Sequence, residues 1–294
     1  MIPLRRLANL RAWMLAALAL LAGCAGMTRL AYDNADALVQ SVAQEYFEFD
    51  AAQSRDLKAR LQRFHEWHRV NELPLYAAFL SSADRRFARG ITTDDVTWAF
   101  DTMRARYRFL AARAIEEGAP LLATLSPAQV SVLERKLGDN NEKYARNFIL
   151  PDEPRRVRAQ ARRMLQSMRQ WTGDVTREQQ ALIEDFARAH DRQTRLRFED
   201  RVRWQNEALD LLRQRLPAKE LAPRLAKLFT DPDARRSQEF RREDRRWQED
   251  FGRLLVELNG TLSRIQRAHV AQRLESYASD FTALAARTGK EART

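Results

Sequence analysis

Hydrophobic residues recur along the chain at alternating steps of three and four residues, the spacing of one face of an α-helix. Further stripes of the same kind fall within 130–148, 240–258 and 270–284. No stretch shows the period-two alternation typical of a half-buried strand. The clearest stripe consists of Val96, Phe100, Met103, Tyr107, Leu110 and Ala114. The pattern predicts an all-α protein.

Turn and cap residues separate these stripes. They predict about eight to ten amphipathic helices with short connections, which is an irregular multi-helix bundle. The polar segment 188–207 keeps an apolar stripe, and we expect it to pack against the helix at 240–258. No linker divides the chain, so 24–294 is interpreted as a single helical domain with a possible seam near 149–154. The predicted breaks are 88–95, 137–141, 149–154, 171–176, 229–233 and 258–261.

Composition supports a folded helical chain. It is 45% hydrophobic and 31% charged, with few Gly and Pro residues, which is far from the composition of disordered proteins. The net charge of +11 raises the question of nucleic-acid binding. However, basic residues are interleaved with acids, as in 241–250, which is typical of solvated helical faces. We therefore expect no nucleic-acid partner.

The N-terminal segment has the parts of an export signal. Arg5, Arg6 and Arg11 surround the start of a short apolar core at 12–22, and small residues follow it. The core is shorter than the roughly 20 residues that a membrane-spanning helix needs. Residues 1–23 are therefore predicted to be a cleaved signal peptide, and an ordinary signal with an incidental cysteine is the alternative.

The end of this segment, Leu21-Ala22-Gly23-Cys24, resembles the lipobox of bacterial lipoproteins. The resemblance implies cleavage between Gly23 and Cys24, followed by attachment of a diacylglycerol and an acyl chain such as palmitate to Cys24. Ala25 at the next position implies the outer membrane, facing the periplasm, rather than the inner membrane. Cys24 is the only cysteine, so its acylation excludes disulfides, thiol catalysis and cysteine metal sites. No other cofactor is expected.

Four predicted helix starts share one scheme, in which Asp, Ser or Thr is followed three residues later by Gln. This is the spacing of a capping box, in which the first side chain caps the helix and the Gln reaches back to the cap amide. The pairs are Asp50 and Gln53, Ser126 and Gln129, Thr176 and Gln179, and Ser263 and Gln266. Plain capping explains them without any function.

The same four sites also resemble the Leu-Thr-x-x-Gln motif of Spy-type periplasmic chaperones. That resemblance implies a helical protein that holds unfolded clients on a basic, amphipathic face. It covers only about five residues at each site, and this chain is longer than those proteins.

The segment 63–80 is the densest candidate for chemistry. His65 and His68 are three residues apart and Glu72 follows four later, so the three could share a helical face and bind zinc. The sequence His-Glu-Trp-His lacks the metalloprotease spacing. We instead interpret His68 as a buried histidine held by Glu72, with Pro74 restarting the helix. No catalytic or metal-binding residue is assigned.

The lipobox, followed by 29–36, 45–53 and the Trp-His-Arg-x-x-Glu-Leu-Pro-x-Tyr segment beginning at Trp67, resembles an uncharacterised family of proteobacterial lipoproteins. That resemblance implies an envelope location and no activity. A functional surface is sought first at Tyr32, Asn34, Trp67, His68, Arg69, Glu72 and Tyr76. The leading prediction is a non-enzymatic lipoprotein that binds an envelope protein or an unfolded client. The alternatives are an envelope enzyme acting on peptidoglycan or lipid through His65, His68 and Glu72, and a scaffold that binds anionic lipid headgroups by charge.

Overall fold

The computed structural model describes residues 25–287, and within them it contains helices, turns and no strand. The predicted all-α class is confirmed, whereas the signal peptide, Gly23 and Cys24 lie outside the described residues. The first half contains α2 (Ala25–Asp33), α3 (Ala35–Phe47), α4 (Ala51–Asn71), α5 (Leu73–Ala88), α6 (Thr93–Leu122) and α7 (Pro127–Phe148). The second half contains α8 (Glu153–Thr172), α9 (Arg177–Ala189), α10 (Asp191–Arg213), α11 (Ala218–Thr230), η1 (Pro232–Ala234), α12 (Gln238–Thr261) and α13 (Arg264–Ala286).

The helices outnumber the eight to ten expected because long stripes are divided at single residues. Glu72 separates α4 from α5, since Pro74 has no amide hydrogen for a continuous helix. A single residue, His190, likewise separates α9 from α10, here without a proline. The break expected at 137–141 is wrong, because α7 continues through it. There the Asn140 amide is buried and donates to the Tyr46 hydroxyl at 2.5 Å instead of shaping a turn.

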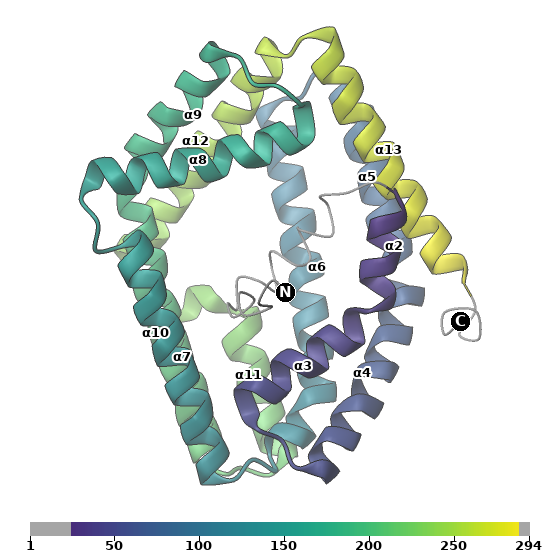
Figure 1. Cartoon of the computed structure of the whole chain (residues 1–294), viewed down its shortest axis with the longest axis vertical. Helices are drawn as coiled ribbons and strands as arrows, with labels where there is room; N and C mark the ends of the chain where they lie inside the picture. The colour runs from purple at the N-terminus through teal and green to yellow at the C-terminus, as the bar shows by residue number, and fades with distance from the viewer. Residues whose placement is uncertain (1–24, 288–294) are drawn as a thin grey trace, which may run out of the picture.

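The two halves repeat one arrangement of helices. In the first half α3 packs on α4 and α7, and α4 packs on α6; in the second half α8 packs on α9 and α13, and α9 packs on α12. One helix of each half, α5 in the first and α10 in the second, is here called its arm. The arms are exchanged between the halves, since α10 lies along α7 and α5 lies along α13 (Figure 1). The central helices α6 and α12 also contact each other. The described chain therefore contains an internal repeat of helix contacts, with α11 as an additional helix on α6.

The arrangement is an elongated frame rather than a parallel bundle. Figure 1 shows α7 with α10 along one long side, α5 with α13 along the other, and α6 running between them. One apolar core joins α6, α7, α10 and α11, and it includes Ile115, Leu133 and Leu209. A second core joins α8, α9 and α12 around Ile183 and Leu254. As expected, the polar segment in α10 packs on α12.

None of the described helices is both long enough and apolar enough to cross a membrane.

Candidate functional site

The histidine segment forms a closed polar cluster where α2, α4 and α5 meet. The Tyr32 hydroxyl lies 3.0 Å from Nδ1 of His68, and the ring of Tyr76 meets the His68 ring edge-on at 5.5 Å. Burial, with a smaller contribution from His65, lowers the pKa of His68 to about 4. Its imidazole is therefore neutral at pH 7, and it joins α4 to α2 through Tyr32.

The expectation that Glu72 holds His68 is wrong. Glu72 is completely buried at the α4–α5 junction and its Oε1 lies 3.3 Å from Nη1 of Arg106 on α6. Burial raises the pKa of this carboxyl, and the Arg106 charge opposes that rise. His65 pairs with yet another residue, Asp36, since its Nδ1 lies 2.6 Å from Oδ1 of that carboxylate. Each of the three proposed chemical groups is thus committed to a different helix.

The geometry brings together only part of the predicted surface. Tyr32, Arg69 and Glu72 are buried. Trp67 lies on a different part of α4, where its ring packs 5.7 Å from Phe109. Asn34 is exposed and donates to the Leu30 carbonyl at 2.7 Å, which fixes the α2–α3 corner. Within residues 25–287 no group of three His, Cys, Asp or Glu side chains is placed to hold a metal ion.

All four Gln-bearing helix starts contain a capping box in the structure. At α9, Oε1 of Gln179 accepts from the Thr176 amide at 3.0 Å while the Thr176 hydroxyl accepts from the Gln179 amide at 3.2 Å. The equivalent bonds at α13 are 2.9 and 3.1 Å, between Ser263 and Gln266. Each start therefore satisfies two amide groups that a helix leaves without an internal partner.

The four starts also meet in two pairs, which local capping does not require. Gln179 Nε2 donates to Oε1 of Gln266 at 3.1 Å, and Gln266 Nε2 donates back to Oε1 of Gln179 at 3.0 Å. Gln53 and Gln129 exchange the same two bonds, at 3.3 and 2.6 Å. These two Gln pairs lie at opposite ends of the frame, where α4 meets α7 and where α9 meets α13 (Figure 1).

The surroundings of the two Gln pairs match as well. Gln53 Nε2 also donates to the carbonyl of Thr124, and Gln179 Nε2 donates to the carbonyl of Thr261, both at 3.3 Å. The sequence holds a signal for this match that single helix starts do not reveal, namely Thr-Leu-Ser-x-x-Gln at both 124–129 and 261–266. The Gln pairs therefore mark the internal repeat and connect helix starts that are far apart in the chain.

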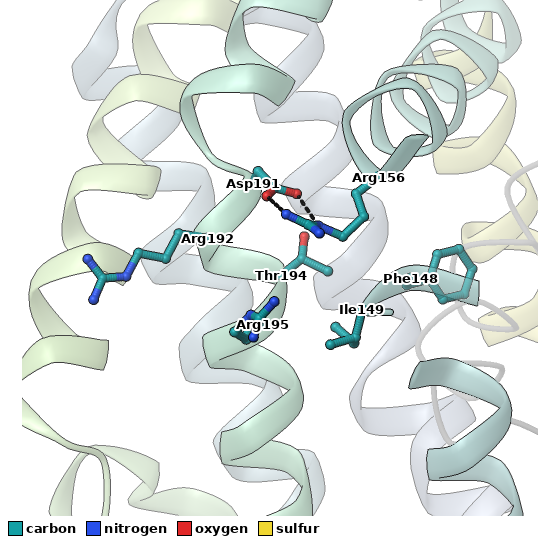
Figure 2. A pocket seen from close by; sticks show the side chains of 7 residues that line it. All are labelled: Phe148, Ile149, Arg156, Asp191, Arg192, Thr194 and Arg195. Atoms are coloured by element: carbon teal, nitrogen blue, oxygen red, sulfur yellow. Dashed lines mark hydrogen bonds and ion pairs between the residues drawn. The ribbon is translucent and has the colours of Figure 1, made fainter. Parts of the chain in front are cut away.

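Of two concave sites on the described surface, one is small and the other is apolar. The pocket in Figure 2 has a volume of about 20 Å³, close to one water molecule, and lies between the end of α7 and the starts of α8 and α10. Its Arg156 and Asp191 form a two-pronged ion pair, with Nε to Oδ1 at 2.9 Å. A hollow of about 530 Å³ between α5 and α13 is lined by small side chains without titratable groups. Neither site gathers an acid and a base around open space.

The fold and the site together define an all-helical protein in which two similar halves are each held by a Gln pair. Comparison of the sequence with known families assigns the chain to one of them. Residues 45–250 match the model of a family described as "Family of unknown function (DUF6279)", and the chain belongs to that family. The prediction of an uncharacterised family is confirmed at this level. No curated protein and no solved structure matches the chain.

Proposed function

We propose that this protein is a lipid-anchored, periplasm-facing lipoprotein of the bacterial outer membrane that binds unfolded or partly folded client proteins without catalysing a reaction. The lipobox ending at Cys24 supports the anchor and the location. The Leu-Thr-x-x-Gln resemblance of the helix starts supports the client-binding role. The observation that carries the proposal furthest is the exposed middle of α6.

The middle of α6 is exposed although it is central in the frame (Figure 1). Met103 is 49% exposed, Tyr107 is 46% exposed and Phe109 is 50% exposed. Exposed arginines, Arg104 and Arg108, lie between them. A helix that alternates large apolar side chains with arginines offers apolar contacts to the hydrophobic residues of an unfolded segment and ion pairs to its acidic residues. It also resembles the basic, amphipathic face implied by the chaperone motif.

The enzyme alternative has less support. It requires His65, His68 and Glu72 to act on one substrate, yet their partners are Asp36, Tyr32 and Arg106. Glu72 is fully buried, and neither of the two pockets described above is lined by any of the three. Their geometry supports a structural role that joins α2, α3 and α6 to the α4–α5 junction.

The client-binding role is tested by the suppression of aggregation of a chemically denatured client by the purified chain. Changing Met103→Gln together with Tyr107→Gln keeps helix propensity and removes two half-exposed apolar contacts. We expect suppression about tenfold weaker, from the loss of roughly 0.8 kcal/mol per half-buried side chain. The matched control is Leu150→Gln with Ile265→Gln, which removes apolar side chains that are 72% and 83% exposed elsewhere.

Each result has a definite meaning. Equal weakening by the α6 variant and by the control refutes α6 as the client surface, and no suppression by the unmodified chain refutes client binding altogether. The anchor is tested separately by the mass of the mature N-terminal peptide, which should begin at Cys24 and carry acyl chains. A mature N-terminus without acylation would refute the anchor.

A further inference from the structure

The exposed face of α8 is the most one-sided charged surface of the described chain. Its sequence contains six arginines and one glutamate, and that glutamate is its first residue. At 100° per residue, the exposed arginines on one edge fall within about 60° of arc and span about 21 Å of helix. We name these four the α8 arginine stripe: Arg155, Arg158, Arg162 and Arg169.

The stripe is scarcely neutralised by neighbouring acids. Arg155 has a loose contact with Asp152, at 3.8 Å between two exposed groups. No ion pair is found for Arg158, Arg162 or Arg169 in the described part of the chain. Elsewhere the arginines mostly pair within one helix turn or across helices, as Arg156 does with Asp191. The stripe therefore retains most of its positive charge.

A further exposed arginine lies on α10, near the start of α8. Figure 2 shows Arg195 at the rim of the small pocket, apart from the Arg156–Asp191 pair. Arg195 is exposed. Leu150 directly follows the pocket residue Ile149 in the chain and is 72% exposed, so an apolar side chain is exposed at the end of α7. Arginines beside an exposed apolar residue match the polar and apolar layers at a bilayer surface.

The internal repeat shows that the fold itself does not require these arginines. The counterpart of α8 in the first half is α3, which packs on α4 and α7 as α8 packs on α9 and α13. The α3 sequence contains Asp36 and Glu45 and no arginine or lysine. The same structural position is thus acidic in one half and strongly basic in the other. The charge belongs to α8 and not to the architecture or to the overall arginine content.

The end of α8 and the helix α2 contact the same helix, α13. Trp171, at the end of α8, packs against Tyr277 of α13 with ring centroids 6.0 Å apart. One turn further along α13, Asp280 forms a 2.8 Å ion pair with Arg29 of α2. The end of α8 and the helix α2 therefore contact α13 at positions about one turn, roughly 5 Å, apart along that helix.

From these observations, the geometry points to the α8 arginine stripe as a docking surface for anionic phospholipid headgroups, which sets the orientation of the anchored frame against the bilayer. The inference rests on the membrane location in the proposed function. Acyl chains hold the chain to the membrane but leave the folded body free to rotate about its tether. Phosphates along an anionic bilayer offer repeated partners to arginines spread along one helix edge, each contributing about 1 kcal/mol.

The test is vesicle flotation of the chain from Ala25 to Thr294, which keeps every described helix and has no residue to acylate. Vesicles of phosphatidylcholine alone are compared with vesicles that also contain phosphatidylglycerol, at low and at high salt. We expect flotation with the anionic vesicles only, and its loss at high salt because the charges are screened. Flotation that is equal with both vesicles, or unaffected by salt, would overturn the inference.

The variant R155Q/R158Q/R162Q/R169Q should bind the anionic vesicles roughly six-hundredfold more weakly, from about fivefold per arginine. The matched control R55Q/R135Q/R242Q/R245Q removes the same charge from exposed arginines on α4, α7 and α12. It should bind within about twofold of the unmodified chain if position matters. Far-ultraviolet circular dichroism and melting curves confirm that both variants keep the fold.

Two outcomes would refute the stripe as a lipid surface. Equal loss in both variants would show attraction by net charge alone. Tight binding of duplex DNA that depends on the stripe, without vesicle binding, would show a nucleic-acid surface instead. These results are independent of the client assay, which contains no lipid, so failure of either proposal is seen separately.

Discussion

The reciprocal Gln pairs predict an energetic coupling between residues that are 87 positions apart in the chain. Gln179 is completely buried and Gln266 is 6% exposed. Changing Gln179→Ala removes the bond to the Thr176 amide, both bonds to Gln266 and the bonds to Thr261. With about 1 kcal/mol for the cap and about 1 kcal/mol for each mutual amide bond, the expected loss of unfolding free energy is about 3 kcal/mol.

A double-mutant cycle separates pairing from capping. If each Gln only capped its own helix, the losses for Q179A and Q266A would add. Because the two bonds between them disappear in either single variant, we expect the double variant to lose about 2 kcal/mol less than the sum. The measurement is urea unfolding followed by circular dichroism, with the free energy extrapolated to water.

The control cycle takes one residue from each Gln pair. Gln53 and Gln266 belong to opposite ends of the frame, so Q53A and Q266A should add to within about 0.5 kcal/mol. A coupling below about 0.3 kcal/mol for Gln179 with Gln266, or an equal coupling in the control cycle, would refute the view that the Gln pairs hold the repeat together.

Two further predictions concern titratable groups. The pKa of His68 is about 4 in the folded chain and 6.5 in the unfolded one, so the unfolded state binds the extra proton and stability falls as the pH drops from 6.5 towards 4. His68→Gln should remove up to about 3 kcal/mol of that loss in pH-dependent urea unfolding, and an unchanged pH profile would contradict the buried neutral ring. Hydrogen bonds from Arg86 and Thr92 overcome the effect of burial and hold the pKa of Asp95 at about 2. Its contribution is therefore complete above pH 3.8 and is lost as the pH falls through about 2. Asp95→Asn should cost about 2 kcal/mol at neutral pH, whereas the exposed neighbour Asp94→Asn should cost less than about 0.5 kcal/mol; equal costs would contradict the role of Asp95.

The features that could be predicted from the sequence are those that depend on neighbouring residues. The stripe from Val96 to Ala114 predicts a helix through its spacing alone, and α6 contains it. The burial expected for this stripe is wrong in the middle of α6, where Met103 and Tyr107 are about half exposed. The capping pairs depend on residues three apart, so their local geometry follows from the sequence. The restart of the helix near Pro74 depends on one missing amide hydrogen.

Features that depend on distant partners could not be predicted in this way. The Gly-Asp-Asn-Asn run at 138–141 has turn composition, yet Asn140 bonds to Tyr46, which is 94 residues away. His68 and Glu72 are one turn apart, yet their partners come from α2 and α6. In both cases a buried polar group is satisfied by a residue that the local pattern does not contain, and tertiary contacts override the local preference.

The internal repeat also changes the meaning of the segment 149–154, which was interpreted as a possible seam. It separates the two halves in sequence, but α10 lies along α7 and α5 lies along α13 across that division. The core around Ile115 and Leu133 includes Leu209 from the second half. Each half on its own would therefore expose the face of an arm that its partner covers. The exchanged arms therefore predict that the two halves unfold together, and the differences between equivalent positions, such as acidic α3 and basic α8, are where separate functions of the halves should be sought.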